Sequence, residues 1–245
     1  MVRSGVPSSA SWEDYRCVVP TWPLGAHRRP MRADADLSLR GHVRLLTEFL
    51  ERLDLRDATL VQNDIAIALV LAGERPERVA RLVLVACEAF DNYPPGLPGR
   101  VAKLASVVPG GLNALVQPLR FRPLRRLPLA MGWLTKRRVP NEVTDAWLRP
   151  LLSDPRVRRD LIKYARSADK RDMIEATERL RNFDRPALVV WATEDRIMPP
   201  EHGRRLVELL PNARLVEIAD SYTVVPEDQP AELAVAIREF VRSTA

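Results

Sequence analysis

Residues 59–69 read TLVQNDIAIAL, and the architecture expected for the whole chain follows from them. An apolar run rich in β-branched residues, 58–61, gives way to a polar triplet, 62–64. The chain then becomes apolar and helix-favouring over residues 65–72. This order predicts a strand, a tight turn and a helix, which together present one polar side chain at the tip of a sheet strand beside a helix N-terminus. Asp64 holds that position.

Strands and helices alternate on both sides of this turn. Short apolar runs predict further strands at residues 15–19, 81–87, 187–193 and 214–218. Helical spacing of apolar residues predicts a helix that Ser38 caps and further helices at residues 200–210 and 230–242. Alternation of this kind predicts an α/β fold with a mostly parallel sheet flanked by helices.

Residues 92–182 interrupt the alternation with helical segments and proline breaks but no convincing strand. We therefore expect an α/β core made of residues 1–91 and 183–245, with residues 92–182 inserted between two strands. A chain of 245 residues is long enough to bury the core of one such domain.

Positive charge is concentrated in the insertion. The chain carries a net charge of +6, and between Asp91 and Glu142 it has nine basic residues and no acidic one. Such a run suits a surface for nucleic acid or anionic lipid, or simply the solvated face of amphipathic helices. Phe121 is the single aromatic residue interleaved with the basic ones, so no stacking platform for nucleic acid is expected.

Cys17 and Cys87 fit neither a metal spacing nor a disulfide framework, and we expect buried thiols in a reducing cytoplasm. No apolar run approaches the roughly 20 residues that a membrane span needs. The first 15 residues lack the apolar core of a signal peptide. The expectation is a cytoplasmic protein without a metal or a cofactor.

Together these segments resemble the α/β-hydrolase superfamily, in particular the branch of haloalkane dehalogenases and epoxide hydrolases. That branch carries an Asp nucleophile in a Gly-x-Asp-x-Gly-Gly turn, and residues 62–67 (QNDIAI) stand at its place. The resemblance implies that Asp64 is the nucleophile, that residues 92–182 form a helical cap and that Asp195 is the triad acid. Thr223 occupies the position of the catalytic His.

The missing His has a mechanistic consequence. An Asp nucleophile displaces a halide or opens an epoxide without help, but hydrolysis of the resulting ester needs a base that activates water. Glu88 or Asp91, just past the third predicted strand, could supply one. The three histidines of the chain are expected at the surface, namely His27, His42 and His202.

Residues 4–12 (SGVPSSASW) resemble the oxyanion-hole loop of the family, although such a stretch is equally typical of a disordered N-terminus. The match implies an anion site formed by the backbone N–H groups of Val6 and Ile65. It also implies that the first three strands of the family are missing. The loss of the third strand would leave a gap in the sheet or force the strand at residues 15–19 to pair directly with the strand at residues 58–61.

Three functions stay open. The first is an α/β-hydrolase-fold enzyme with a pocket for a small apolar molecule, lined in part by Trp22. The second is a non-hydrolytic relative that uses Asp64, Glu88 and Asp91 for proton transfer, isomerisation or ligand binding. The third is a module that binds an anionic partner through residues 92–141.

The same residues also have structural interpretations. Asn63 or Asp64 is a suitable N-cap for the following helix. The carboxylate of Asp195 suits loop hydrogen bonding or a charge pair with Arg196. A nucleophile turn has a strained, positive φ and needs small neighbours, of which this chain supplies only Ala66.

Overall fold

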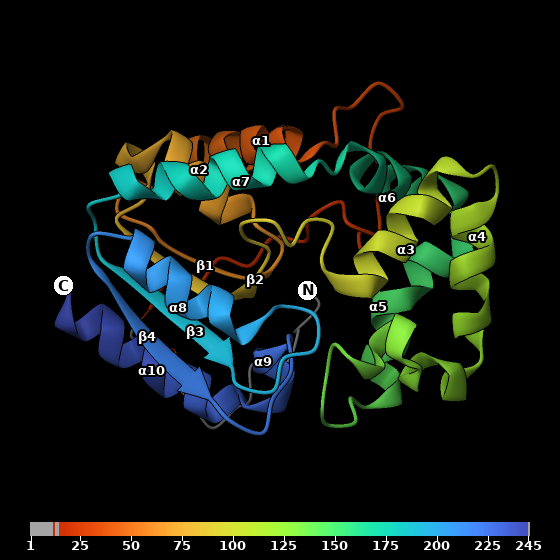
Figure 1. Cartoon of the computed structure of the whole chain (residues 1–245). Coiled ribbons are helices and arrows are strands. Elements are labelled where there is room, and N and C mark those ends of the chain that lie inside the picture. The colour runs from red at the N-terminus through yellow and green to blue at the C-terminus, as the bar shows by residue number, and fades with distance from the viewer. Residues whose placement is uncertain (1–11, 13–14, 245) are drawn as a thin grey trace.

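The computed structural model describes residues 12 and 15–244, and a four-stranded parallel sheet forms its centre (Figure 1). The strands follow the order β1-β2-β3-β4, so neighbours in sequence are neighbours in the sheet. Parallel neighbours need crossover connections, and helices supply them. The strand bounds are β1 Thr59–Asp64, β2 Arg81–Cys87, β3 Ala187–Ala192 and β4 Ala213–Ile218.

Helices cover the sheet on both faces, as expected for a parallel sheet. In Figure 1, α1, α2 and α7 lie above the sheet and α10 lies below it. Helix α8 packs on β3 and β4. The bounds are α1 Leu39–Arg52, α2 Ile67–Glu74, α7 Lys170–Glu178, α8 Pro200–Leu209, α9 Val225–Asp228 and α10 Pro230–Ser243, with short turns at η1 Pro76–Arg78 and η5 Arg179–Asn182.

The rest of the insertion between β2 and β3 forms a helical lobe beside the sheet (Figure 1). It has a small apolar cluster of its own, made of Leu112, Val116, Leu151 and Leu152. No described residue of 92–182 is in a strand, as predicted. The elements are α3 Gly96–Val107, α4 Gly111–Val116, η2 Gln117–Arg120, η3 Arg122–Arg126, η4 Pro128–Gly132, α5 Asn141–Ser153 and α6 Pro155–Ser167.

Helix α7 and η5 return from the lobe and pack on α2 of the core. Met173 and Leu180 accordingly belong to the main apolar core rather than to the cluster of the lobe. The boundary at residue 182 between core and insertion therefore stays a prediction. None of the described helices is long and apolar enough to cross a membrane.

Local sequence patterns placed most elements correctly. The Ser38 side chain accepts a hydrogen bond from the Gly41 backbone N–H at 3.0 Å, which caps α1 as predicted. The apolar stripe of α1 is buried through Val43, Leu46 and Leu50. Strand β2 has the predicted bounds, and Cys87 at its end is buried.

The prediction of a strand at residues 15–19 is wrong. This segment forms no strand in the described structure, Val19 is 73% exposed, and the Cys17 thiol that we expected to be buried is exposed. A short apolar run becomes a strand only when a neighbour accepts its backbone hydrogen bonds. Among the described residues β1 is the edge of the sheet, and nothing pairs with its outer side.

Helix α8 lies close to β3 because it carries a glycine at the contact. A Cβ at Gly203 would stand 2.9 Å from ring atoms of Trp191, which is fully buried in β3. The Trp191 indole N–H also donates to the Met198 backbone carbonyl at 3.2 Å, so the ring is held in place. No side chain larger than hydrogen fits this contact without moving the ring.

We expect Gly203→Ala to lower the free energy of unfolding by roughly 1–3 kcal/mol, because the added methyl group overpacks the Trp191 contact. Urea unfolding followed by tryptophan fluorescence measures this change. Glu208→Ala, on the exposed face of the same helix, is the control and should stay within about 0.5 kcal/mol of the parent protein. An unchanged unfolding midpoint for Gly203→Ala would contradict the close approach.

Candidate active site

Asp64 lies where β1 turns sharply into α2. Its φ is +70°, and the pairing of β1 with β2 shifts register between Asn63 and Asp64. The Asp64 carbonyl accepts the Glu88 backbone N–H at 2.8 Å, which anchors the turn to the end of β2. The carboxylate is partly exposed and accepts no hydrogen bond from the described residues. A positive φ without glycine is uncommon and marks strain of the kind found at functional turns.

Two amide side chains hold this turn. The Gln62 side-chain oxygen accepts the backbone N–H groups of Ala68 at 2.6 Å and Leu69 at 3.2 Å, so Gln62 satisfies donors at the start of α2. Asn63 donates to the backbone carbonyls of Thr223 at 2.7 Å and Val85 at 2.9 Å. The expectation that Asn63 or Asp64 caps α2 is therefore wrong.

Asp195 follows β3 and uses its two oxygens differently. Oδ1 accepts the backbone N–H groups of Ile197 at 2.8 Å and Met198 at 2.9 Å, and the Thr223 hydroxyl donates to it at 2.7 Å. Oδ2 is buried and has no partner among the described residues. Thr223 is fully buried. Thr223, at the expected His position, thus contacts Asp195, the expected acid, but leaves Asp195 Oδ2 without a hydrogen-bond partner among the described residues.

Three carboxyl groups interact at this end of the sheet. Burial, reinforced by the negative charge of Asp195, raises the pKa of Asp64 to about 6. Burial also raises the pKa of Asp195 to about 6, although hydrogen bonds from Met198, Ile197 and Thr223 oppose the rise. For Glu88, burial and the charge of Asp64 hold the pKa well above its ordinary value.

Glu88 is only 2% exposed and joins the turn to the helical insertion. Its Oε2 accepts the Ala66 backbone N–H at 3.2 Å. The Tyr164 hydroxyl of α6 lies 3.3 Å from the same oxygen. Burial and the charge of Glu88 raise the pKa of Tyr164 well above its ordinary value, so the phenol stays a donor. Glu88 thus links the Asp64 turn to α6 through these two contacts.

Other residues proposed for the site lie elsewhere. Asp91 is exposed and pairs with Lys170 at 3.2 Å, so it does not join Glu88 and Asp64. Trp22 packs edge-on against Phe49 of α1. The Ile65 backbone N–H, expected in an anion site, donates to the Asn63 carbonyl at 2.9 Å. Val6, its expected counterpart, lies outside the described residues.

The three histidines are buried, so their predicted surface location is wrong. His27 contacts Asp160 at 3.1 Å, and His42 contacts the Ser38 carbonyl at 3.0 Å. His202 packs against the Phe90 ring, with ring centroids 5.2 Å apart. Each serves a local contact. Among the described residues none forms a hydrogen bond with Asp64 or Asp195.

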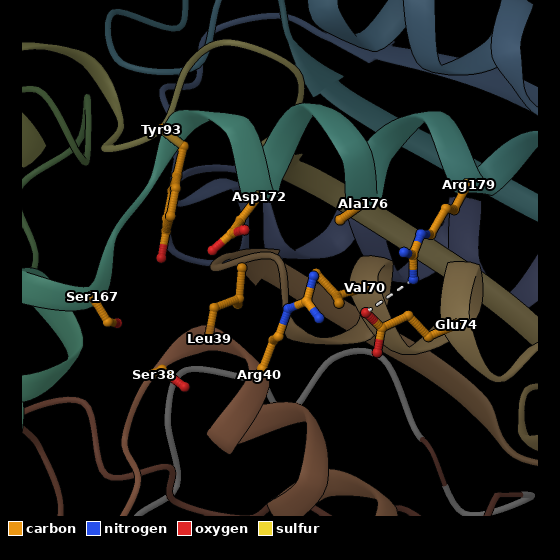
Figure 2. A pocket seen from close by; sticks show the side chains of 10 residues that line it. All are labelled: Ser38, Leu39, Arg40, Val70, Glu74, Tyr93, Ser167, Asp172, Ala176 and Arg179. Atoms are coloured by element: carbon orange, nitrogen blue, oxygen red, sulfur yellow. Dashed lines mark hydrogen bonds and ion pairs between the residues drawn. The ribbon is translucent and has the colours of Figure 1, made fainter.

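Figure 2 shows a small pocket between α1, α2 and α7, with Tyr93 at one end. Its volume is about 60 Å³, room for a few water molecules. The walls are mixed in polarity rather than apolar, and neither Asp64 nor Asp195 lines them. An apolar pocket around Asp64 therefore stays a prediction. The lining residues are Ser38, Leu39, Arg40, Val70, Glu74, Tyr93, Ser167, Asp172, Ala176 and Arg179.

Comparison with known proteins shows the family to which the chain belongs. A family model described as alpha/beta hydrolase fold matches residues 6–230. An uncharacterized hydrolase of Bacillus subtilis, YugF, is 25% identical over 207 residues, which are 81% of this chain and 70% of that protein. A haloalkane dehalogenase of Mesorhizobium japonicum is 39% identical over 72 residues, 29% of this chain and 23% of that protein.

Two further similarities extend over most of the chain. A 2-hydroxy-6-oxononadienedioate/2-hydroxy-6-oxononatrienedioate hydrolase of Cupriavidus pinatubonensis is 27% identical over 179 residues, 70% of this chain. This match spans 57% of that hydrolase, less than two thirds of its length. The crystal structure of a putative ancestral haloalkane dehalogenase matches with a TM-score of 0.72 and 19% identity, covering 90% of this chain and 80% of that one.

We expect Asp64→Asn to stabilise the protein at pH 8 and to change little at pH 4. The folded protein binds the Asp64 proton more tightly than the unfolded chain, whose pKa is near 3.8, so ionisation costs stability as the pH rises through 6. Allowing for partial exposure, the gain at pH 8 is about 1–2 kcal/mol. Urea unfolding at both pH values measures it.

The control for this experiment is Asp91→Asn. Asp91 is exposed and its pKa is lowered by the Lys170 hydrogen bond, so its loss should not stabilise the protein at either pH. Equal effects of Asp64→Asn at pH 4 and pH 8 would contradict the raised pKa of Asp64.

Proposed function

Because the chain belongs to the family of proteins with the alpha/beta hydrolase fold, we propose that it is a hydrolase whose nucleophile is Asp64. The substrate class is a small apolar electrophile, an alkyl halide or an epoxide. The observation that supports this proposal above all is the Asp64 turn itself. A strained φ of +70° at the tip of β1 carries a carboxylate that makes no hydrogen bond with the described residues.

The first half of the reaction needs only Asp64. One carboxylate oxygen attacks the carbon that carries the leaving group, the carbon–halogen bond breaks with its electron pair, and a halide leaves. The product is an alkyl ester of Asp64. With a pKa of about 6, the carboxylate is ionised at pH 7.5 and able to attack. The similarity to a haloalkane dehalogenase over 72 residues supports this substrate class.

The second half of the reaction needs a base, and Asp195 fills this role in our proposal. Its Oδ1 is fixed by three donors, while the buried Oδ2 is without a partner among the described residues. Asp195 takes a proton from water, the hydroxide adds to the ester carbonyl of Asp64, and the departing alcohol recovers the proton. A base that is buried beside Thr223 meets water rarely, so we expect this half to be slow.

A second candidate function uses the same carboxyl groups without a covalent step. Glu88 is buried and its pKa is held well above its ordinary value, whereas the pKa of Asp64 is about 6, so in this candidate Glu88 serves as the acid and Asp64 as the base. The Tyr164 hydroxyl at 3.3 Å orients Glu88. Such a pair supports proton transfer or isomerisation of a bound molecule. Covalent labelling of Asp64 separates the two candidates, because only the hydrolase forms an ester.

We expect n-butyl bromide to add one butyl group to Asp64, seen by intact-mass spectrometry and located by peptide mapping. Cys17→Ser is the background for this experiment, since the exposed Cys17 thiol also reacts with alkyl halides. Asp64→Asn should abolish the addition. The labelling rate should rise with pH through about 6, because only ionised Asp64 attacks. No labelling at pH 8 would overturn the proposed nucleophile.

We expect Asp195→Asn to leave the labelling of Asp64 intact and to stop release of butanol. Thr223→His should speed this release by about 10²-fold or more, the usual contribution of a positioned general base. Single-turnover release of butanol from the labelled enzyme measures both effects, and thermal unfolding shows whether the larger side chain at position 223 is accommodated. Undiminished release in Asp195→Asn would rule out Asp195 as the base.

A further inference from the structure

We propose that α3 and the adjacent segment 121–129 form a surface that binds an anionic lipid bilayer, and we call it the α3 face. This proposal does not depend on the nucleophile. It rests on exposed apolar side chains, on cations without an ion-pair partner among the described residues, and on a shallow apolar depression, which lie on α3 or on the segment whose η4 packs against it. Each is argued from residues that the structure describes.

Helix α3 exposes large apolar residues on one side instead of burying them. Leu97, Leu104 and Val107 are 51%, 65% and 54% exposed, although their spacing places them on one side of the helix. Arg100 stands on the same stripe. Ser106 is the only buried residue of α3. A helix that serves only the interior of a protein turns its large apolar residues inward, so this stripe is typical of an interaction surface.

The exposed apolar surface continues beyond α3. Helix α3 packs on η4, where Leu129 is 46% exposed, and Leu127 just before η4 is 52% exposed. Phe121, earlier in the same segment, is 68% exposed. Aliphatic and aromatic side chains that project beside cations are the usual composition of an interfacial membrane surface.

Ion pairs among the described residues neutralise only part of the positive charge of residues 92–141. Arg122 and Arg125 pair with Asp145, and Lys136 and Arg137 pair with Asp220. The other basic residues of the segment form no ion pair with a described carboxylate, namely Arg100, Lys103, Arg120, Arg126 and Arg138. Two of these five, Arg100 and Lys103, belong to α3. The α3 face is therefore cationic as well as apolar, which suits anionic lipid headgroups.

A depression on α3 has the composition that a lipid requires. It encloses about 290 Å³ and is lined by Pro94, Arg100, Lys103, Leu104 and Val107. Its apolar walls suit the upper part of an acyl chain. Arg100, which is exposed, and Lys103, whose ammonium donates to the Ala168 carbonyl, both line the depression. A phosphate group above an acyl chain would meet charge and apolar surface in that order.

The composition of the α3 face argues against two other partners, a second copy of the chain and nucleic acid. A second copy of the chain would bring the same cationic surface against itself, which is unfavourable. Nucleic acid is bound through aromatic stacking or base contacts along a cationic groove, whereas Phe121 is the one exposed aromatic ring among the large apolar residues of the α3 face. An anionic bilayer uses both the charge and the aliphatic side chains.

The test is sedimentation of the whole chain with vesicles of phosphatidylcholine alone and of phosphatidylcholine with phosphatidylglycerol. We expect retention on the anionic vesicles at low salt, at least tenfold above retention on the neutral ones. Leu104→Glu with Val107→Glu should lower retention at least tenfold. Val235→Glu is the matched control, because Val235 is similarly exposed on α10 but lies outside the α3 face, and it should bind like the parent.

Arg100→Glu should remove most of the preference for anionic vesicles. Equal retention on neutral vesicles, or undiminished retention of the Leu104→Glu, Val107→Glu variant, would overturn the proposal. So would a stable dimer in analytical ultracentrifugation that the same variant dissociates, or retention of DNA in place of vesicles. Circular dichroism of each variant checks the fold, and the butyl-labelling rate of Asp64 tests the proposed hydrolase separately from the surface.

Discussion

The sharp turn from β1 into α2 is the constraint on which the rest of the site depends. A φ of +70° costs a residue with a side chain of order 1–3 kcal/mol, and surrounding contacts must hold it. Gln62 binds the first turn of α2, Asn63 binds the Thr223 carbonyl, and the Glu88 N–H binds the Asp64 carbonyl. Each contact joins β1 to a different neighbour. The turn therefore keeps its shape although the family's glycines are absent from it.

Three carboxyl groups lie near this turn, and their burial does not stabilise the fold. Burial raises the pKa values of Asp64, Asp195 and Glu88, and repulsion from a neighbouring carboxylate adds to the rise for Asp64 and Glu88. A core built only for stability would carry neutral side chains at these positions. Carboxyl groups that repel each other at the carboxyl end of a parallel sheet are instead typical of acid–base and nucleophilic chemistry.

The sequence predicted the parts of the fold that depend on local patterns. Strand β2 and the capped start of α1 follow from apolar runs and from Ser38. The prediction of a strand at residues 15–19 was wrong because a strand needs a neighbouring strand to pair with. The sequence pattern of one segment does not reveal whether such a neighbour exists. The role of Gln62 was missed for a related reason. Its long side chain reaches α2 only once the turn is formed, whereas capping rules consider Asn63 and Asp64.

The residue at position 223 shows that the fold can be kept while a group needed for catalysis is missing. The family match, the sheet and the Asp64 turn survive with Thr at this position, because Thr223 still binds Asp195 and its carbonyl still receives Asn63. The Thr hydroxyl satisfies one oxygen of Asp195 and extends no further, so the second oxygen stays open. Attack by Asp64 depends on the turn alone, whereas release depends on a base. In the proposed reaction, the first half therefore tolerates Thr at position 223 better than the second half does.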